Sequence, residues 1–159
     1  SAEDKRRITE HILERESRRK TSARNAFFGK VARVIQGDIQ ARVELSTLGG
    51  HAISSVITVD SVQSLGIRPG MLLTAEIKAP WVLVETCGPE PSSSAENRLQ
   101  GVIDRVTVGK LTAEVIVRLA DDTRVCSVTT AESALRLELR AGNPAWVTFS
   151  AYSVILKVD

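Results

Sequence analysis

Short segments of alternating apolar and polar residues run through the chain. The alternation is clear over residues 41–46 and returns over residues 113–119. A period of two is typical of strands that bury one face. Residues 48–51 and 120–123 supply Gly and Asp between paired runs, as hairpin turns require. The pattern therefore predicts a mainly β protein.

The pattern occurs twice, at a spacing of 72 residues. Residues 22–84 align with residues 94–156 without a gap, and 18 of the 63 aligned pairs are identical. So many identities in so constant a register indicate two copies of one module, and a repeat of this kind decides the architecture.

Each copy is expected to contain five strands and one short helical turn. The strands of the first copy are predicted at the following positions: 26–36, 38–47, 51–58, 71–78 and 82–86. The helical turn is expected over residues 60–65, with Asp60 as its N-cap. Five short strands with one small helix are typical of an OB-like barrel. The fold class predicted is two tandem five-stranded OB-like barrels.

Three segments lie outside or between the strand-forming regions. Pro and Ser predict a linker over residues 89–93, which separates a first module of residues 22–88 from a second of residues 94–159. Residues 1–21 are expected to form an N-terminal linker helix, because positions 3–20 lack Gly and Pro and are rich in Glu and Arg. Its apolar stripe is thin, so we expect it to pack on a partner or connect to another domain.

Composition weakens several classes of function. No apolar run reaches the roughly 18 residues that span a bilayer, so we expect a soluble, cytoplasmic protein with no membrane partner. Cys87 and Cys126 lie far apart without a CxxC motif, and His11 and His51 are isolated. These residues favour buried thiols over a transition-metal site, and no catalytic set has a local signature. We expect a protein that is not an enzyme.

The net charge of +2 is unevenly distributed. Residues 1–30 hold nine Lys and Arg against five Asp and Glu, which leaves the remainder of the chain negative. A basic N-terminus raises the possibility of nucleic-acid binding. No aromatic residue precedes Phe27, however, so no stacking surface accompanies the charge. A solvated helix face, or a linker to a further segment, is the favoured interpretation.

The first copy carries groups suited to binding an oxyanion. A dianion with four oxygens favours one or two cations together with hydroxyl and amide donors, and unpaired amides at a helix start favour anions. Such groups occur in three stretches: Ser22, Ala23 and Arg24 before the first strand, Thr58 and Ser61 around the short helix, and Lys78 and Ala79 after the fourth strand.

The second copy lacks the two cations. Glu96 stands where the first copy has Arg24, and Ser150 stands where it has Lys78, whereas both hydroxyl positions persist as Thr130 and Ser133. A requirement of the fold alone does not link these changes. The pattern favours one binding copy beside one scaffold copy.

Three motifs of the first copy resemble the molybdate-binding (Mop, or TOBE) module. They are Thr21-Ser22-Ala23-Arg24-Asn25 followed by Gly29-Lys30-Val31, Ile57-Thr58-Val59-Asp60-Ser61 and Lys78-Ala79-Pro80-Trp81-Val82. Two such copies behind a helical segment resemble the C-terminal half of the ModE-type molybdate-responsive transcriptional regulators. The resemblance covers residues 21–159.

The resemblance implies a ligand and an assembly. In that family the tandem modules form a homodimer, and two molybdate or tungstate ions are held at the subunit interface. By position, Ser22, Arg24, Lys78 and the Ala79 backbone come from one subunit, and Thr58 and Ser61 come from the other. Family regulators reach DNA through a preceding winged helix-turn-helix domain, after which residues 1–21 would be the linker. Asp60 is expected to point away from the anion.

The sequence therefore predicts the oxyanion sensor domain of a transcriptional regulator. One alternative is a tandem-Mop molybdenum storage protein (a molbindin), against which the helical segment argues. The other is an OB-fold nucleic-acid-binding module. That function usually needs aromatic residues on the binding strands, and the second copy replaces Phe27 and Phe28 by Leu99 and Gln100.

Overall fold

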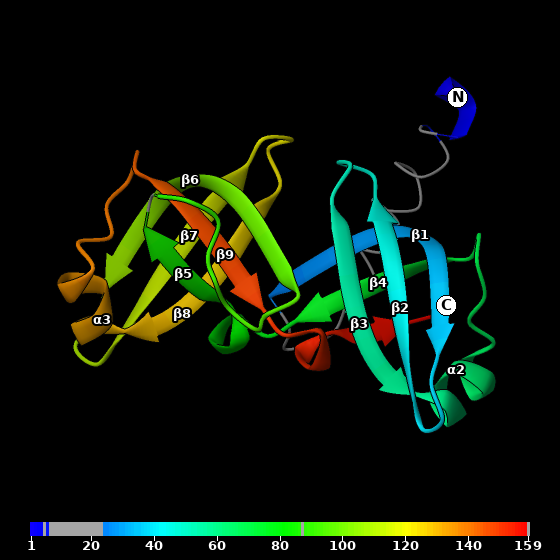
Figure 1. The fold of residues 1–159 in the computed structure, drawn as a ribbon. Coiled ribbons are helices and arrows are strands. Elements are labelled where there is room, and N and C mark those ends of the chain that lie inside the picture. Colours follow the sequence, from blue (N-terminus) through cyan, green and yellow to red (C-terminus); the bar gives the residue numbers. More distant parts are fainter. Residues whose placement is uncertain (5, 7–23, 87, 159) are drawn as a thin grey trace.

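The computed structural model describes residues 1–4, 6, 24–86 and 88–158. In this part of the chain, two curled antiparallel sheets of five strands lie side by side, each with one short helix at its outer end (Figure 1). The mainly β fold predicted from the alternation is confirmed. Residues 2–4 and 6 are helical, and the rest of the predicted linker helix lies outside the described residues.

The first repeat contains the following elements in order: β1 (Asn25–Gln36), β2 (Gln40–Thr47), β3 (Ala52–Thr58), α2 (Val59–Leu65), β4 (Leu72–Ile77), the 3₁₀ turn η1 (Ala79–Trp81) and β5 (Leu83–Thr86). The second repeat contains β6 (Asn97–Val108), β7 (Thr112–Leu119), β8 (Arg124–Thr130), α3 (Ala131–Arg136), β9 (Pro144–Phe149), η2 (Ala151–Ser153) and β10 (Ile155–Lys157). No strand of the first repeat differs from its predicted bounds by more than two residues.

Thr58, and not Asp60, caps the short helix of the first repeat. The Thr58 hydroxyl oxygen accepts a hydrogen bond from the Ser61 amide at 3.0 Å, and Gly66 ends the helix in the left-handed conformation at φ 65°. Asp60 lies exposed in the first turn. The prediction of Asp60 as the N-cap was wrong because the chain leaves β3 in an extended conformation at Thr58, which places that hydroxyl over the free amides.

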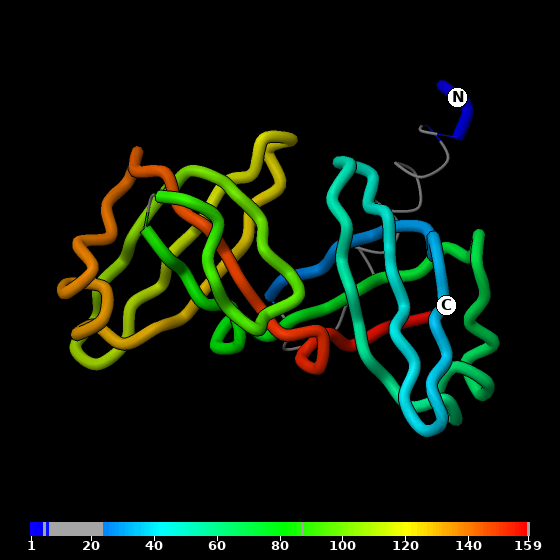
Figure 2. Tube along the Cα trace, viewed as in Figure 1, coloured from blue at the N-terminus to red at the C-terminus, as the bar shows by residue number. Residues whose placement is uncertain are grey.

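The two repeats exchange their fifth strands. One sheet has the order β10-β4-β1-β2-β3, and the other has the order β5-β9-β6-β7-β8. The exchange is reciprocal, since β5 of the first repeat pairs with β9, and β10 of the second repeat pairs with β4. Figure 2 shows the chain crossing to the second sheet after β4 and returning to the first sheet at its C-terminal end. Each sheet is therefore complete only in the presence of the other repeat.

Buried asparagine side chains make equivalent hydrogen bonds between the two repeats. The Asn25 side chain donates to the Cys126 carbonyl at 2.8 Å and accepts from the Cys126 amide at 2.7 Å. Asn97 makes the same pair of hydrogen bonds with the backbone of Ser54, at 2.9 and 2.7 Å. Both asparagines are buried, with exposed fractions of 2% and 1%. Since 72 residues separate the matching partners, the junction obeys the same repeat as the sequence.

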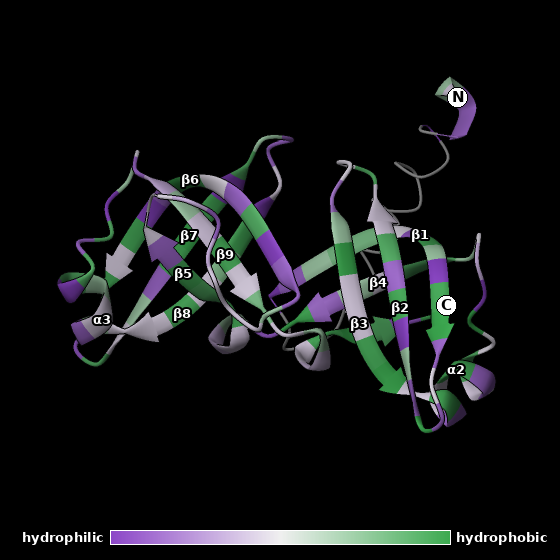
Figure 3. Ribbon diagram, in the orientation of Figure 1, coloured by the Kyte–Doolittle hydropathy of each residue, from purple (hydrophilic) through white to green (hydrophobic). Residues whose placement is uncertain are grey.

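One hydrophobic core extends through both repeats. Alternation along β2 buries Ala41, Val43 and Leu45, and Figure 3 shows hydrophobic and hydrophilic residues interleaved along such strands. The rings of Phe27 and Phe149 stack across the junction with centroids 6.3 Å apart. The repeats therefore share apolar packing as well as strands and hydrogen bonds.

Gly29 and Gly101 lie where adjacent strands approach closely. A β-carbon on Gly29 would lie 2.5 Å from the Ser46 carbonyl oxygen, and one on Gly101 would lie 2.5 Å from that of Arg118. We expect Gly29→Ala to reduce the free energy of unfolding by about 1–3 kcal/mol, because paired backbone must move.

Thermal and denaturant unfolding measure the effect of this substitution. Gly101→Ala should match it, whereas the exposed neighbour change Lys30→Ala should stay within about 0.5 kcal/mol of the parent protein. A Gly29→Ala protein as stable as its parent would contradict this account of the strand contact.

No helix in the described part of the chain is long and apolar enough to cross a membrane.

Candidate functional site

Arg24 and Lys78 leave adjacent strand ends at the centre of the molecule. Arg24 immediately precedes β1, Lys78 immediately follows β4, and the pairing of Asn25 with Ile77 makes the two cations neighbours across the strands. The chain then turns through Ala79, which is buried with its exposed fraction at 2%. The predicted residues Ser22 and Ala23 lie outside the described residues. We call Arg24, Lys78 and Ala79 the cationic half-site.

Arg24 reaches across the junction to the second repeat. Its guanidinium donates a hydrogen bond to Glu114 on β7 at 2.6 Å, and this hydrogen bond lowers the pKa of the Glu114 carboxyl below its usual range. Burial raises the pKa of the nearby Cys126 thiol. Lys78 is exposed and has no ion pair with any residue that the structure describes.

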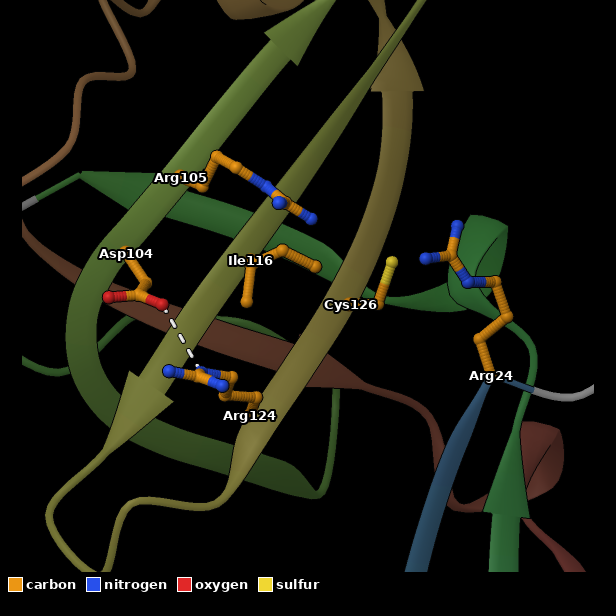
Figure 4. A pocket seen from close by; sticks show the side chains of 6 residues that line it. All are labelled: Arg24, Asp104, Arg105, Ile116, Arg124 and Cys126. Atoms are coloured by element: carbon orange, nitrogen blue, oxygen red, sulfur yellow. Dashed lines mark ion pairs between the residues drawn. The ribbon is translucent and has the colours of Figure 1, made fainter.

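A pocket of about 420 Å³ opens beside Arg24 on the face of the second sheet (Figure 4). Arg105 and Arg124 also line it, so three guanidinium groups surround the pocket. Glu114 lies 3.7 Å from Arg105 as well as beside Arg24, and Asp104 lies 3.2 Å from Arg124. Two carboxylates therefore face three guanidinium groups, so the lining keeps an excess of positive charge although each arginine has an acidic neighbour.

Thr58 and Ser61 place two hydroxyl groups together at the start of α2. The Thr58 hydroxyl donates to the Ser61 hydroxyl oxygen at 2.8 Å, while it also accepts from the Ser61 amide. Both hydroxyls are therefore within reach of a single small ligand. We call Thr58 and Ser61 the hydroxyl half-site.

The two half-sites lie at opposite ends of the first sheet. Asn25 begins β1 beside the cationic half-site. At the other end of β1, Gln36 pairs with Ala41 of β2. The neighbouring β2 residue, Gln40, pairs with Thr58 of the hydroxyl half-site. The twelve residues of β1 join these ends, and at about 3.3 Å per residue they span about 36 Å measured along the curved strand. Figure 1 accordingly shows α2 at the outer end of the molecule and the β4–β5 connection near its centre. One tetrahedral anion cannot contact both half-sites of one chain.

The second repeat preserves the hydroxyls but replaces the cations. Thr130 caps α3 by accepting from the Ser133 amide at 3.0 Å, as Thr58 does in α2. Glu96, the counterpart of Arg24, instead accepts a hydrogen bond from the Ala151 amide at 2.8 Å. Ser150, the counterpart of Lys78, caps η2 through its hydroxyl.

Sequence reasoning missed Glu114 as the partner of Arg24. A signal was present, because the position 72 residues before Glu114 holds Arg42, so charge reverses there just as it reverses between Arg24 and Glu96. Both reversals run from Arg in the first repeat to Glu in the second, so an Arg of the first repeat can pair with a Glu of the second across the junction. His51 was expected to be isolated, yet it lies 3.0 Å from Asp121 of the other repeat.

The described residues contain no group of three or more His, Cys, Asp and Glu side chains placed to hold a metal ion. Within the same residues, Cys126 is a free and buried thiol.

Comparison with known proteins identifies the family. The TOBE domain model matches residues 21–84 and again residues 93–156, which together are most of the chain. The chain belongs to the TOBE domain family. The two matches coincide closely with the two aligned copies found in the sequence.

The TOBE relatives include binding proteins and regulators. The chain is 38% identical over 137 residues to the molybdenum-pterin-binding protein MopA of Rhodobacter capsulatus, covering 86% of this chain and 52% of MopA. It is 33% identical over 137 residues to the transcriptional regulator ModE of Yersinia pestis, with the same coverage. The chain thus spans about half the length of the curated relatives it matches.

A solved structure matches the arrangement of both repeats. The cytoplasmic molybdate-binding protein ModG, in a form with molybdate bound, superposes with a TM-score of 0.85 at 35% identity. The match covers 89% of this chain and 100% of that ModG chain.

Proposed function

We propose that this chain is an oxyanion sensor domain that binds molybdate or tungstate between two copies of itself, without chemical conversion of the ligand. The observation that carries the proposal is the separation of the half-sites. Neither the cationic half-site nor the hydroxyl half-site alone offers the full set of donors, and Arg24, Lys78 and Thr58 are exposed at the surface. A second copy of the chain supplies the missing half.

The donors match the chemistry of a tetrahedral dianion. Arg24 presents a planar fork of N–H groups, and Lys78 adds a point charge. Thr58 and Ser61 contribute hydroxyl groups, and the Ala79 amide, with Ser22 and Ala23, completes the proposed set. Charge-assisted hydrogen bonds are the strong ones, so the cationic half-site supplies most of the affinity and the hydroxyls complete the cage.

Exposed apolar residues flank both half-sites. Trp81 and Leu83, with exposed fractions of 62% and 61%, follow Lys78 and Ala79 along the chain. Ile39 is 73% exposed, and its carbonyl accepts from the Val59 amide at the start of α2. Large apolar side chains beside polar binding groups are typical of a surface that another subunit covers. We therefore propose that the α2 end of one chain packs on the central turn of its partner.

Repetition of the same surface residues supports this interface. Ile39, Leu65 and Leu83 are exposed, and so are their counterparts Leu111, Leu137 and Ile155. Apolar character at matched surface positions in both copies has no role in either core. Burial in an assembly of chains accounts for it.

We also propose that the chain is part of a transcriptional regulator. It is supported by the similarity to ModE of Yersinia pestis, and it implies DNA binding through a domain that precedes these residues. A stand-alone molybdate-binding or storage protein is the second candidate, favoured by the match over the full length of the ModG chain. The description of ModG as cytoplasmic supports the proposed cytoplasmic location.

Calorimetric titration with molybdate, tungstate, sulfate and phosphate tests the proposed ligand class. We expect saturable binding of molybdate and tungstate at about one ion per chain, with sulfate at least tenfold weaker because its shorter bonds leave donors out of reach. Phosphate should also bind poorly, because the proton that it keeps near neutral pH would face N–H and O–H donors where an acceptor is needed. Equal affinity for all four ions, or no heat with molybdate, would contradict the proposal.

Glu114→Gln should strengthen oxyanion binding. Glu114 holds the Arg24 fork in the absence of ligand, so its carboxylate competes with the oxyanion for the same guanidinium. Exposed ion pairs contribute about 0.2–1 kcal/mol, which corresponds to a roughly 1.5- to 5-fold gain in affinity. Titration calorimetry measures this gain. Glu44→Gln, which removes the Arg33–Glu44 pair away from both half-sites, is the matched control and should leave affinity unchanged. Weaker binding by Glu114→Gln would overturn this role.

A further inference from the structure

We propose that the Glu96 carboxylate is an internal anion that closes the second repeat to oxyanions, so that each chain has one open cationic half-site. This inference rests on the proposed function, because it names which of two equivalent positions takes the ligand. It is carried by a hydrogen bond: the Ala151 amide donates to Glu96 Oε1 at 2.8 Å. Ala151 is the counterpart of Ala79, whose amide belongs to the proposed site of the first repeat.

Glu96 and Arg24 start from the same place in their modules. Asn97 pairs with Phe149 as Asn25 pairs with Ile77, and both asparagines are fixed by equivalent hydrogen bonds across the junction. Asn25 therefore fixes the backbone beside Arg24, and Asn97 fixes it beside Glu96, so both side chains start at the same strand end. The difference between the repeats lies in the side chain and not in the backbone that presents it.

The backbone on the opposite strand is equivalent as well. Ser150 has φ −70° and ψ 144°, and Lys78 has φ −69° and ψ 138°, so both lead into the same 3₁₀ turn. The amide of the next residue must then point the same way in the two repeats. In the second repeat this amide already donates to a carboxylate, which is the kind of acceptor that an oxyanion would provide.

The remaining groups of the second repeat complete the closure. The Ser150 hydroxyl accepts from the Tyr152 amide at 3.1 Å, so it serves the local turn and brings no charge. A second anion arriving there would meet the Glu96 charge without counterparts of Arg24 and Lys78 to offset it, and like charges repel. The hydroxyls of Thr130 and Ser133 are retained, so only the cationic end is closed.

Resonances of the Ala79 and Ala151 amides in the full chain test the inference. Without ligand, Glu96→Ala should shift the Ala151 amide proton to higher field, because the carboxylate that accepts its hydrogen bond is removed, and it should leave the Ala79 amide unshifted. An unshifted Ala151 amide in folded Glu96→Ala would overturn the role of Glu96 whether or not any oxyanion binds.

Molybdate added at neutral pH tests the closure itself. In the parent chain we expect saturable shifts of the Ala79 amide and none of the Ala151 amide. The double change Glu96→Arg with Ser150→Lys should make the Ala151 amide respond to molybdate as well, with a shift of the same order. A response of Ala151 in the parent chain, or no response in the folded double variant, would overturn the inference. Absence of any shift at Ala79 would instead refute the proposed function, while the Ala151 amide in Glu96→Ala would still report on Glu96.

Discussion

Replacing either Arg24 or Lys78 by alanine should weaken molybdate binding by roughly tenfold to a few hundredfold. Charge-assisted hydrogen bonds contribute about 1.5–3 kcal/mol each, and either truncation leaves a dianion less compensated in a partly desolvated site. Arg24→Ala removes a planar guanidinium that can contact two oxygens, whereas Lys78→Ala removes a single point charge. Titration calorimetry on the purified variants measures both losses.

The second repeat supplies matched controls for these two substitutions. Glu96→Ala changes the counterpart of Arg24, and Ser150→Ala changes the counterpart of Lys78. Neither should alter molybdate affinity at the first repeat, because neither lies in a half-site that takes the ligand. Equal losses from the variants of both repeats would show that the site was assigned to the wrong repeat.

Asn25→Ala should cause a large loss of stability. Truncation removes two buried hydrogen bonds and leaves the amide and carbonyl of Cys126 without their partner at the junction of the repeats. An unsatisfied buried polar group costs about 1–3 kcal/mol, so the free energy of unfolding should fall by about 2–5 kcal/mol. In a chain of this length that lowers the melting temperature by roughly 5–15 °C.

Calorimetry or denaturant unfolding checks the asparagine prediction. Asn97→Ala should produce a similar loss, because Asn97 makes the same two hydrogen bonds to Ser54. Asn143→Ala, at an exposed turn position, is the control and should change stability by no more than about 0.5 kcal/mol. A small effect of Asn25→Ala would mean that the junction depends on the exchanged strands and shared core alone.

The sequence predicted the strands well because each strand is encoded locally. Alternation over residues 41–46 and turn residues at 48–51 depend only on neighbours along the chain, so the bounds of β2 and β3 followed from the pattern. The helix of residues 59–65 was also expected, although its N-cap was misplaced. The identity of the N-cap depends on the extended backbone conformation at Thr58, which the residue types alone do not reveal.

The exchange of fifth strands could not be predicted from periodicity. Leu83 and Ile155 are counterparts in the repeat, and either can pair with β4 or β9 with the same alternation. Packing and the course of the chain between the repeats decide which of these two strands each one pairs with. Both depend on the whole chain and not on local sequence. Asn25 and Asn97 carried a usable signal, since an identical buried amide in both copies can join them symmetrically.

The placement of the half-sites depends on this long-range organisation. Motifs around Arg24, Thr58 and Lys78 predict the donors of the proposed site. The distances between those donors follow only from strand register, which puts Thr58 at the far end of the sheet from Arg24 and Lys78. The structure brings two of the three positions together and leaves the third at the far end of the sheet.

Complementation between two inactive chains tests whether one oxyanion site is shared between two subunits. One chain carries Arg24→Ala with Lys78→Ala and keeps its hydroxyl half-site, and the other carries Thr58→Ala with Ser61→Ala and keeps its cationic half-site. Each alone should bind molybdate weakly. Equal mixing with exchange of subunits should restore about one tight site per four chains, because half of the dimers then contain both variants and one intact interface. No recovery of tight binding in mixtures shown to contain the mixed dimer would contradict a site shared between chains.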